Sequence, residues 1–243
     1  YNLKPLNNGG KRWAEGSLFI LKGENKSMQD FDATLRRIAS KTNQQISPVA
    51  SGFSDLGIDL GSNEMEYIAP KRVGLIKSDN ASPQGYGEVW HFFEQQLKYP
   101  ITQISMNRLN DRTLDQFDVL ILPPGYYSNF ASKDSELLQW IRKGGRVIAL
   151  GSAVGAFDGH DSLSLQLKEN SDDANTQNIP FAEGERNDIS SAIYGSIYAV
   201  DVDTTHPLAF GYDKHYYSLK NSEVSYSFLD GGNVGKLSKN SKP

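Results

Sequence analysis

The sequence predicts an α/β fold with a doubly wound, mainly parallel sheet. Three short apolar runs, at 72–76, 117–122 and 146–150, have the length and composition of buried strands. Helical stretches and turns rich in glycine or proline separate these runs. Buried strands that alternate with helices indicate parallel pairing, because each parallel connection needs a long crossover.

The composition restricts the classes of partner and site. The chain has 243 residues, a net charge of −4 and no cysteine. The charge gives no reason to expect nucleic acid or an anionic membrane as partner, and no apolar run approaches the ~18 residues that span a bilayer. The missing cysteine excludes disulfides, thiolate metal sites and a cysteine nucleophile. We expect these residues to be a piece of a longer protein, with residues 1–15 as a lead-in or linker.

The first part of the predicted domain, residues 16–70, has the order strand, helix, strand. The strands are expected at 17–21 and 45–50, with the helix at 27–41 between them. A glycine-punctuated loop is expected at 52–62. The inward face of the helix is predicted to hold Met28, Phe31, Leu35, Ile38 and Ala39.

The central part, residues 71–157, is predicted to carry the sheet. A strand is expected at 101–106, in addition to the three apolar runs, and helices are expected at 88–98 and 132–142. After it come a long loop at 158–190, C-terminal strands within 191–235 and a polar tail at 236–243. We expect 16–235 to form one domain, because residues 16–70 have too little apolar surface to fold alone.

The segment 146–157, RVIALGSAVGAF, is the first place to look for catalytic chemistry. A strand that feeds a tight turn and a helix places the turn at the carboxyl edge of the sheet, where ligands of such folds bind. We therefore predict a crevice at this edge, lined by Gly125, Gly151, Ser152 and Ala153.

The glycines of this turn do not frame a nucleophile. A nucleophile elbow has glycines two residues before and two residues after the reacting residue. Leu150 and Val154 take these positions around Ser152, whereas glycines frame Ala153, which has no reactive group. Either Ser152 is a nucleophile in an atypical elbow, or the elbow is chemically empty, or the turn merely needs small residues. We favour the last two interpretations, because a fold alone does not confer chemistry.

A working serine also needs a base. His206 lies downstream of the elbow and Glu88 opens the predicted helix 88–98, so both are candidates to assist Ser152 in an alternative, enzymatic function. We prefer to interpret His206 as a solvated histidine in a turn. We interpret Glu88 as an acidic residue that the helix dipole favours at a helix start. Gly85 and Gly87 are expected in the loop before that helix, where exposed backbone N–H groups favour an anion, although neither G-x-G-x-x-G nor a P-loop pattern is present.

His91 and Glu94 match the pattern H-x-x-E. Residues three apart on a helix face the same way, but catalytic zinc needs a third protein ligand. No other histidine has a recognisable ligand context, so we expect His91 and Glu94 on a solvated helix face. We therefore expect no metal and no cofactor in this chain.

Several stretches together resemble a known family. DVLILPPG at 118–125 and GGRVIALGSAVGAF at 144–157 look like the central part of a class I glutamine amidotransferase-like domain, whose sheet is flavodoxin-like. GFSDLGIDLGS at 52–62 and THPLAFGY at 205–212 resemble the amidotransferase-like domain found C-terminal to certain bacterial zinc carboxypeptidases, the carboxypeptidase A-like metallopeptidases. The resemblance covers most of 16–235.

The resemblance implies an accessory, non-catalytic domain of an exported carboxypeptidase. The zinc would belong to the catalytic domain of the same polypeptide, which would be the partner of this chain, with peptide or cell-envelope material as substrate. The location would be periplasmic or extracellular. Amidotransferases use a cysteine with a downstream histidine and glutamate, whereas this chain has Ser152 or Ala153 at the elbow and Pro207 and Leu208 after His206. A third alternative is a small-ligand-binding domain that uses the sheet-edge crevice.

Overall fold

A computed structural model describes most of the chain. The described residues are 6–8, 11–13, 17–65, 67–127, 135–160, 163–168, 195–220, 222 and 224–238. The chain forms two compact units, Tyr1–Ala69 and Pro70–Pro243. The boundary coincides with the predicted junction between 16–70 and 71–157, and a single domain over 16–235 stays a prediction.

The N-terminal unit is built around one helix, α1 (Phe31–Thr42), which confirms the helix expected at 27–41. Its other elements are a short 3₁₀ helix, η1 (Lys22–Asn25), and an antiparallel hairpin of β1 (Leu6–Asn8) and β2 (Lys11–Trp13), within the predicted lead-in. On α1 Phe31 and Ala39 are buried as predicted, but Ile38 is exposed, as is Met28 ahead of the helix.

The strands predicted at 17–21 and 45–50 are wrong, because neither segment forms a ladder. Strand propensity depends on a paired neighbour, and the described residues offer these segments none. Leu18 is 74% exposed, so the apolar run covers no core. The loop at 52–62 is confirmed, and it is closed by the Ser54 N–H, which donates to Asp59 Oδ1 at 2.8 Å, and by the Leu60 N–H, which donates to Gly52 O at 2.8 Å.

The second unit contains a four-stranded parallel sheet with the order β4-β3-β5-β6. Numbered by their sequence order within this sheet the strands run 2-1-3-4, the arrangement of a flavodoxin-like sheet, so the predicted α/β fold class is confirmed. The strands are β3 (Val73–Lys77), β4 (Ile101–Ser105), β5 (Val119–Leu122) and β6 (Arg146–Ala149).

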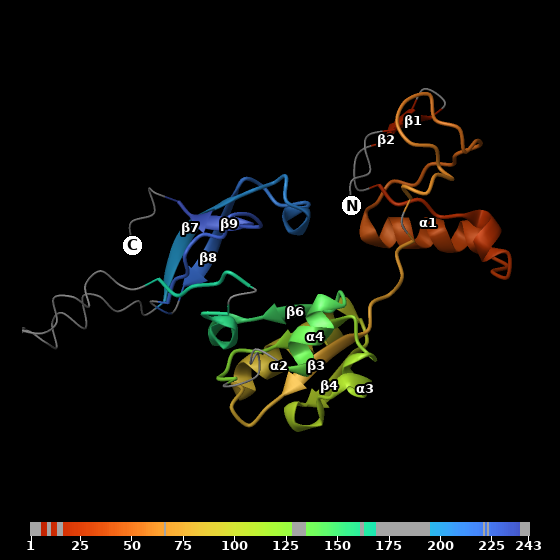
Figure 1. Cartoon of the computed structure of the whole chain (residues 1–243). Helices are drawn as coiled ribbons and strands as arrows, with labels where there is room; N and C mark the ends of the chain where they lie inside the picture. Colours follow the sequence, from red (N-terminus) through yellow and green to blue (C-terminus); the bar gives the residue numbers. More distant parts are fainter. Residues whose placement is uncertain are drawn as a thin grey trace, which may run out of the picture. The chain divides into compact units, whose positions relative to one another are not determined.

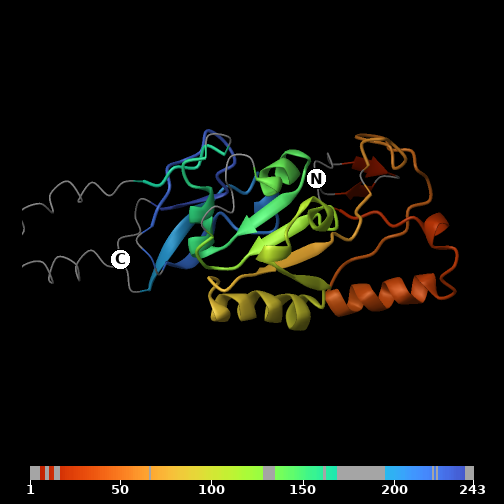
Figure 2. The same ribbon diagram turned by 60° about the horizontal axis from the view of Figure 1, so that its bottom comes forward.

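Helices cover both faces of this sheet, and Figure 2 shows α2 on one side and α4 on the other. One face packs against α2 (Pro83–His91) and its continuation as a π-helix, η2 (Phe92–Leu97). The other face packs against α3 (Asp111–Leu114), α4 (Glu136–Arg142) and the 3₁₀ segment η4 (Gly151–Phe157). Another 3₁₀ turn, η3 (Met106–Arg108), follows β4. The residues 132–134 of the predicted helix 132–142 lie outside the described part.

The C-terminal strands form a second, antiparallel sheet with the order β8-β7-β9 (Figure 1). These are β7 (Ser196–Val202), β8 (His215–Lys220) and β9 (Gly235–Leu237), and a 3₁₀ turn, η6 (Pro207–Ala209), precedes β8. The strand β9 pairs with β7 through Val200 and Leu237. It takes in residues 236 and 237, which were predicted to begin a polar tail. Most of the long loop predicted at 158–190 lies outside the described residues. No described helix is long and apolar enough to cross a bilayer.

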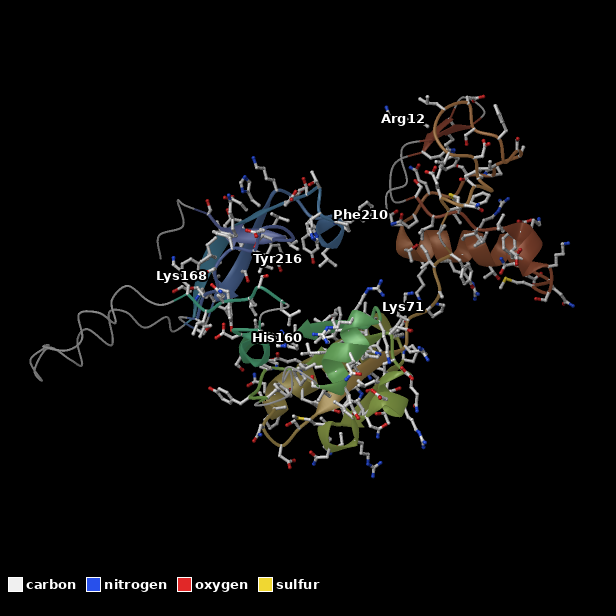
Figure 3. The ribbon with its side chains drawn as sticks, in the orientation of Figure 1. Arg12, Lys71, His160, Lys168, Phe210 and Tyr216 are labelled. Atoms are coloured by element: carbon white, nitrogen blue, oxygen red, sulfur yellow. The ribbon has the colours of Figure 1, made fainter. Side chains whose placement is uncertain are left out.

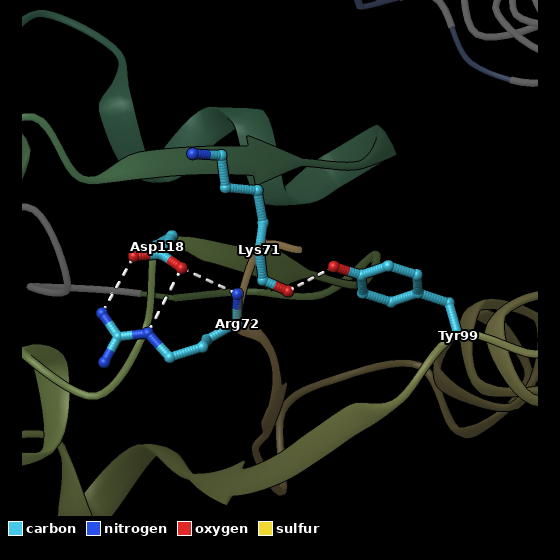
Figure 4. A network of polar contacts seen from close by, with 4 residues as sticks. All are labelled: Lys71, Arg72, Tyr99 and Asp118. Carbon is cyan, nitrogen blue, oxygen red and sulfur yellow. Dashed lines mark hydrogen bonds and ion pairs between the residues drawn. The ribbon is translucent and has the colours of Figure 1, made fainter. Parts of the chain in front are cut away.

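A polar network fixes the amino end of the parallel sheet (Figure 4). Asp118 accepts two hydrogen bonds from the Arg72 guanidinium, at 2.9 and 3.2 Å, and a third from the Arg72 N–H at 2.8 Å. The Tyr99 hydroxyl donates to Lys71 O at 2.6 Å, which joins the approach to β4 to the start of β3. The hydrogen bonds from Arg72 lower the pKa of Asp118 from 3.8 to about 2.

We expect Asp118→Asn to reduce the pH dependence of stability in acid. As the pH falls below 3.8, the unfolded carboxyl takes up a proton while the folded one stays ionised to about 2. The contribution of Asp118 to the free energy of unfolding is therefore present above pH 3.8 and is lost as the pH falls toward 2. The variant should lose about 1 kcal/mol at neutral pH and give a shallower decline in urea denaturation between pH 4 and 2. Asp79→Asn, an exposed carboxylate beyond the other end of β3, is the control; equal slopes for wild type and Asp118→Asn would contradict this prediction.

Candidate functional site

The strained position of the predicted elbow is Gly151. The strand β6 ends at Ala149, and Gly151 then adopts φ 54°, in the left-handed region. Residues that carry a side chain rarely adopt this backbone conformation, whereas glycine adopts it readily. The two predicted registers placed the reacting position at Ser152 or Ala153, but neither residue has a positive φ. The residue at the tip of the turn thus has no side chain, which supports the interpretation of an empty elbow.

Ser152 lies one residue beyond the tip, in η4, and its side chain is exposed. Ala153 is fully buried in the core on the α4 face. Among the described residues no imidazole or carboxylate is hydrogen-bonded to Ser152, so no base is seen to activate its hydroxyl there. The sequence does contain a hint that Gly151 takes the positive φ, because it is the first glycine after the apolar strand.

His206 has a structural task in the turn η6. Its Nδ1 accepts a hydrogen bond from the Leu208 N–H at 3.1 Å and so caps the turn. This agrees with the preferred interpretation of a turn histidine. The Nδ1 atom of His215, on β8, lies 3.2 Å from Oδ1 of Asp201 on the paired strand β7. Neither ring is joined to Ser152.

Glu88 does not open a helix, contrary to the prediction, because α2 begins five residues earlier at Pro83. Ser82 is its N-cap and accepts from the Gly85 N–H at 3.2 Å. Glu88 is an exposed residue inside the helix, and its Oε1 accepts from Gln84 Nε2 at 3.4 Å. Gly85 and Gly87 are therefore helical residues, and the anion site predicted in a loop before the helix is not formed in that way.

At the place of the predicted crevice, the loops after β3 and β5 are joined by backbone hydrogen bonds. The Ser82 N–H donates to Pro124 O at 2.7 Å, and the Tyr126 N–H donates to Asn80 O at 3.2 Å. A Cβ on Gly125 would lie 2.7 Å from both Ala81 Cα and Asn80 O. Gly125 is buried as a result, as is Ala153, so Gly151 and Ser152 are the two exposed residues of the four.

Tyr127 lies two residues after Gly125, and sequence reasoning did not single it out. Its hydroxyl donates to Pro123 O at 2.9 Å, and its side chain is buried. Burial raises the pKa of Tyr127 to about 12. The phenol is thus a structural donor that stays neutral at physiological pH.

His91 and Glu94 are exposed, as predicted, one on the last turn of α2 and the other in η2. They line a groove of about 420 Å³ together with Gly87, Trp90 and Gln95. Within the described residues no group of three or more histidine, cysteine or acidic side chains is placed to hold a metal ion. The third zinc ligand that H-x-x-E would need is missing from this part of the chain.

No family model matches this chain, and no curated protein matches it. The solved structures that are similar to this chain include the following two. A glutamine amidotransferase from Thermotoga maritima is 8% identical, with a TM-score of 0.42 over 69% of this chain and 67% of that chain. A putative ThuA-like protein from Bacteroides uniformis is 14% identical, with a TM-score of 0.46 over 73% of this chain and 72% of that chain. The α/β fold class rests on the strand order described above, and these similarities add no statement about activity.

Proposed function

We propose that this chain is a non-catalytic accessory domain of a longer, exported bacterial zinc carboxypeptidase. In this proposal the zinc and the peptidase active site belong to another domain of the same polypeptide. The accessory domain packs on that catalytic domain, or helps to bind peptide or cell-envelope substrate, in the periplasm or outside the cell.

The main support for a non-catalytic role is the glycine at the strained position of the elbow. An elbow serves catalysis by holding a reactive side chain away from the sheet, and Gly151 has none. Ser152 stands beside it without a described base, and the imidazole of His206 is occupied in capping η6. Nucleophilic catalysis needs the nucleophile and its base within hydrogen-bond reach.

The support for the carboxypeptidase context is the sequence resemblance at 52–62 and 205–212. In the structure 52–62 is a closed loop held by Ser54 and Asp59, and 205–212 contains the capped turn η6. The first test is the gene that encodes these residues. The proposal requires that the same reading frame also encodes a complete H-x-x-E plus distant histidine site, and a reading frame that starts near Tyr1 would contradict it.

The second test concerns Ser152. We expect a fluorophosphonate probe to label the native chain no more than it labels Ser152→Ala, because no described base activates the hydroxyl. In the longer polypeptide, Ser152→Ala should leave the release of C-terminal amino acids from a peptide unchanged, while a zinc chelator abolishes it. Labelling that depends on Ser152, or loss of peptidase activity in Ser152→Ala, would favour the alternative serine enzyme.

A further inference from the structure

A second pocket of the C-terminal unit lies between the segment that follows η4 and the segment that precedes β9, and it shares no lining residue with the predicted crevice. Its volume is about 320 Å³, at the small end of the range for ligand sites. Figure 3 shows His160 on the first of these segments. The lining residues are Gly159, His160, Ser164, Leu165, Gln166, Phe228, Leu229 and Asp230.

The backbone holds the two walls of this pocket together. The Lys168 N–H donates to Ser225 O at 2.9 Å, and the Ser227 N–H donates to Gln166 O at 2.9 Å, on either side of a bridge between 167 and 226. Within the walls the Gly159 N–H donates to Leu165 O at 3.0 Å. Two hydrogen bonds between Asn233 and the backbone of Leu229 fix the far wall. The pocket is therefore preformed, which reduces the entropy cost of binding.

The lining combines one aromatic ring with several polar groups. Phe228 lines the pocket, yet the residue is 71% exposed, so it covers little of the protein core. Gln166 offers a donor and an acceptor, Ser164 offers both in one hydroxyl, and the carboxylate of Asp230 accepts only. An aromatic face attracts polarised C–H groups, because its π-system is negative.

This combination fits a pyranose ring better than an ion. A sugar presents a face of C–H groups to an aromatic ring and a rim of hydroxyls to amides and carboxylates. An anion would meet the carboxylate of Asp230 and no lysine or arginine among the lining residues. A metal ion would need more ligands than His160 and Asp230 provide, and the described residues contain no group of three.

We propose that this pocket binds a saccharide unit, with Phe228 as the stacking platform and Asp230 and Gln166 as acceptors and donors for its hydroxyls. The site is separate from Ser152 and from the predicted crevice, so it goes beyond the proposed accessory role and does not depend on it. The failure of either proposal leaves the other untouched.

The test is an amide NMR titration of the chain with the methyl glycosides of glucose, galactose, mannose and N-acetylglucosamine. We expect at least one glycoside to shift the amides of Gly159 and Leu165 in a saturable way. Phe228→Ala should weaken this binding about tenfold, the value of one lost aromatic contact. Asp230→Asn should weaken it as well, and it serves as the second variant if Phe228→Ala does not fold.

Phe210→Ala is the matched control. Phe210 is 67% exposed, close to the value for Phe228, but it lies on the loop between β7 and β8 and does not line the pocket (Figure 3). Its loss should leave glycoside binding unchanged. The proposal is overturned if no glycoside shifts the two amides, or if Phe228→Ala and Asp230→Asn both bind as the wild type does. Binding of a lysine-containing peptide here, without any response to glycosides, would assign the pocket to a cationic partner and also overturn it.

Discussion

Gly125→Ala is expected to lower the free energy of unfolding by about 3 kcal/mol. The added methyl group would lie 2.7 Å from Ala81 Cα and 2.7 Å from Asn80 O. Both are backbone atoms, so no side-chain rotation can relieve the clash. The loops after β3 and β5 would have to separate, with loss of the hydrogen bond from the Ser82 N–H to Pro124 O. Urea denaturation followed by circular dichroism measures the change.

Gly87→Ala is the matched control, with an effect of opposite sign. A Cβ on Gly87 would meet no heavy atom within 4 Å, and the residue lies inside α2. Alanine in an exposed helix stabilises by about 1 kcal/mol relative to glycine. A Gly125→Ala protein as stable as the wild type would show that the two loops are not in the contact described here.

Trp140→Ala is expected to cost about 4 kcal/mol, as large aromatic deletions in cores do. The side chain is 6% exposed and belongs to the core between α4 and the sheet. It also supports the turn into β6, since a Cβ on Gly145 would lie 2.2 Å from the indole. The deletion would therefore leave a cavity beneath the strand that leads to the elbow.

Trp90→Ala provides the comparison for the same residue type outside the core. Trp90 is 39% exposed on α2, so its removal should cost roughly 1 kcal/mol or less. Denaturation should be followed by circular dichroism, because both variants change the fluorescence. Equal losses for the two variants would contradict the placement of Trp140 in the core.

The parallel sheet was predictable because its strands are dense apolar runs. The observed β3, β5 and β6 fall within two residues of 72–76, 117–122 and 146–150. The start of α2 was missed because Gly85 and Gly87 suggested a loop. A stronger signal was present, since Ser82 followed by Pro83 is a common N-cap and first helical residue.

Elements that depend on distant partners were not predictable from local pattern. The short strand β9 is polar in sequence and exists because its backbone pairs with β7. Conversely, the run at 17–21 has strand composition but no ladder. At the candidate site the turn itself followed from the sequence, but the residue with positive φ did not. The position of the residue with positive φ depends on where β6 ends. If the strand ended one residue later, the positive φ would fall on Ser152 and not on Gly151.

The geometry of Gly151 determines what a side chain at this position would meet. A Cβ at this position would lie 3.5 and 3.6 Å from two carbons of Pro124, ordinary contact distances. The turn therefore has room for a side chain, and the left-handed backbone would cost it about 1–2 kcal/mol. The substitution Gly151→Cys would place a thiol at the tip of the elbow without rebuilding the sheet. A base is harder to supply, because the imidazole of His206 already caps η6. In this scaffold one residue substitution would supply the reactive atom, whereas its activation would also need a base.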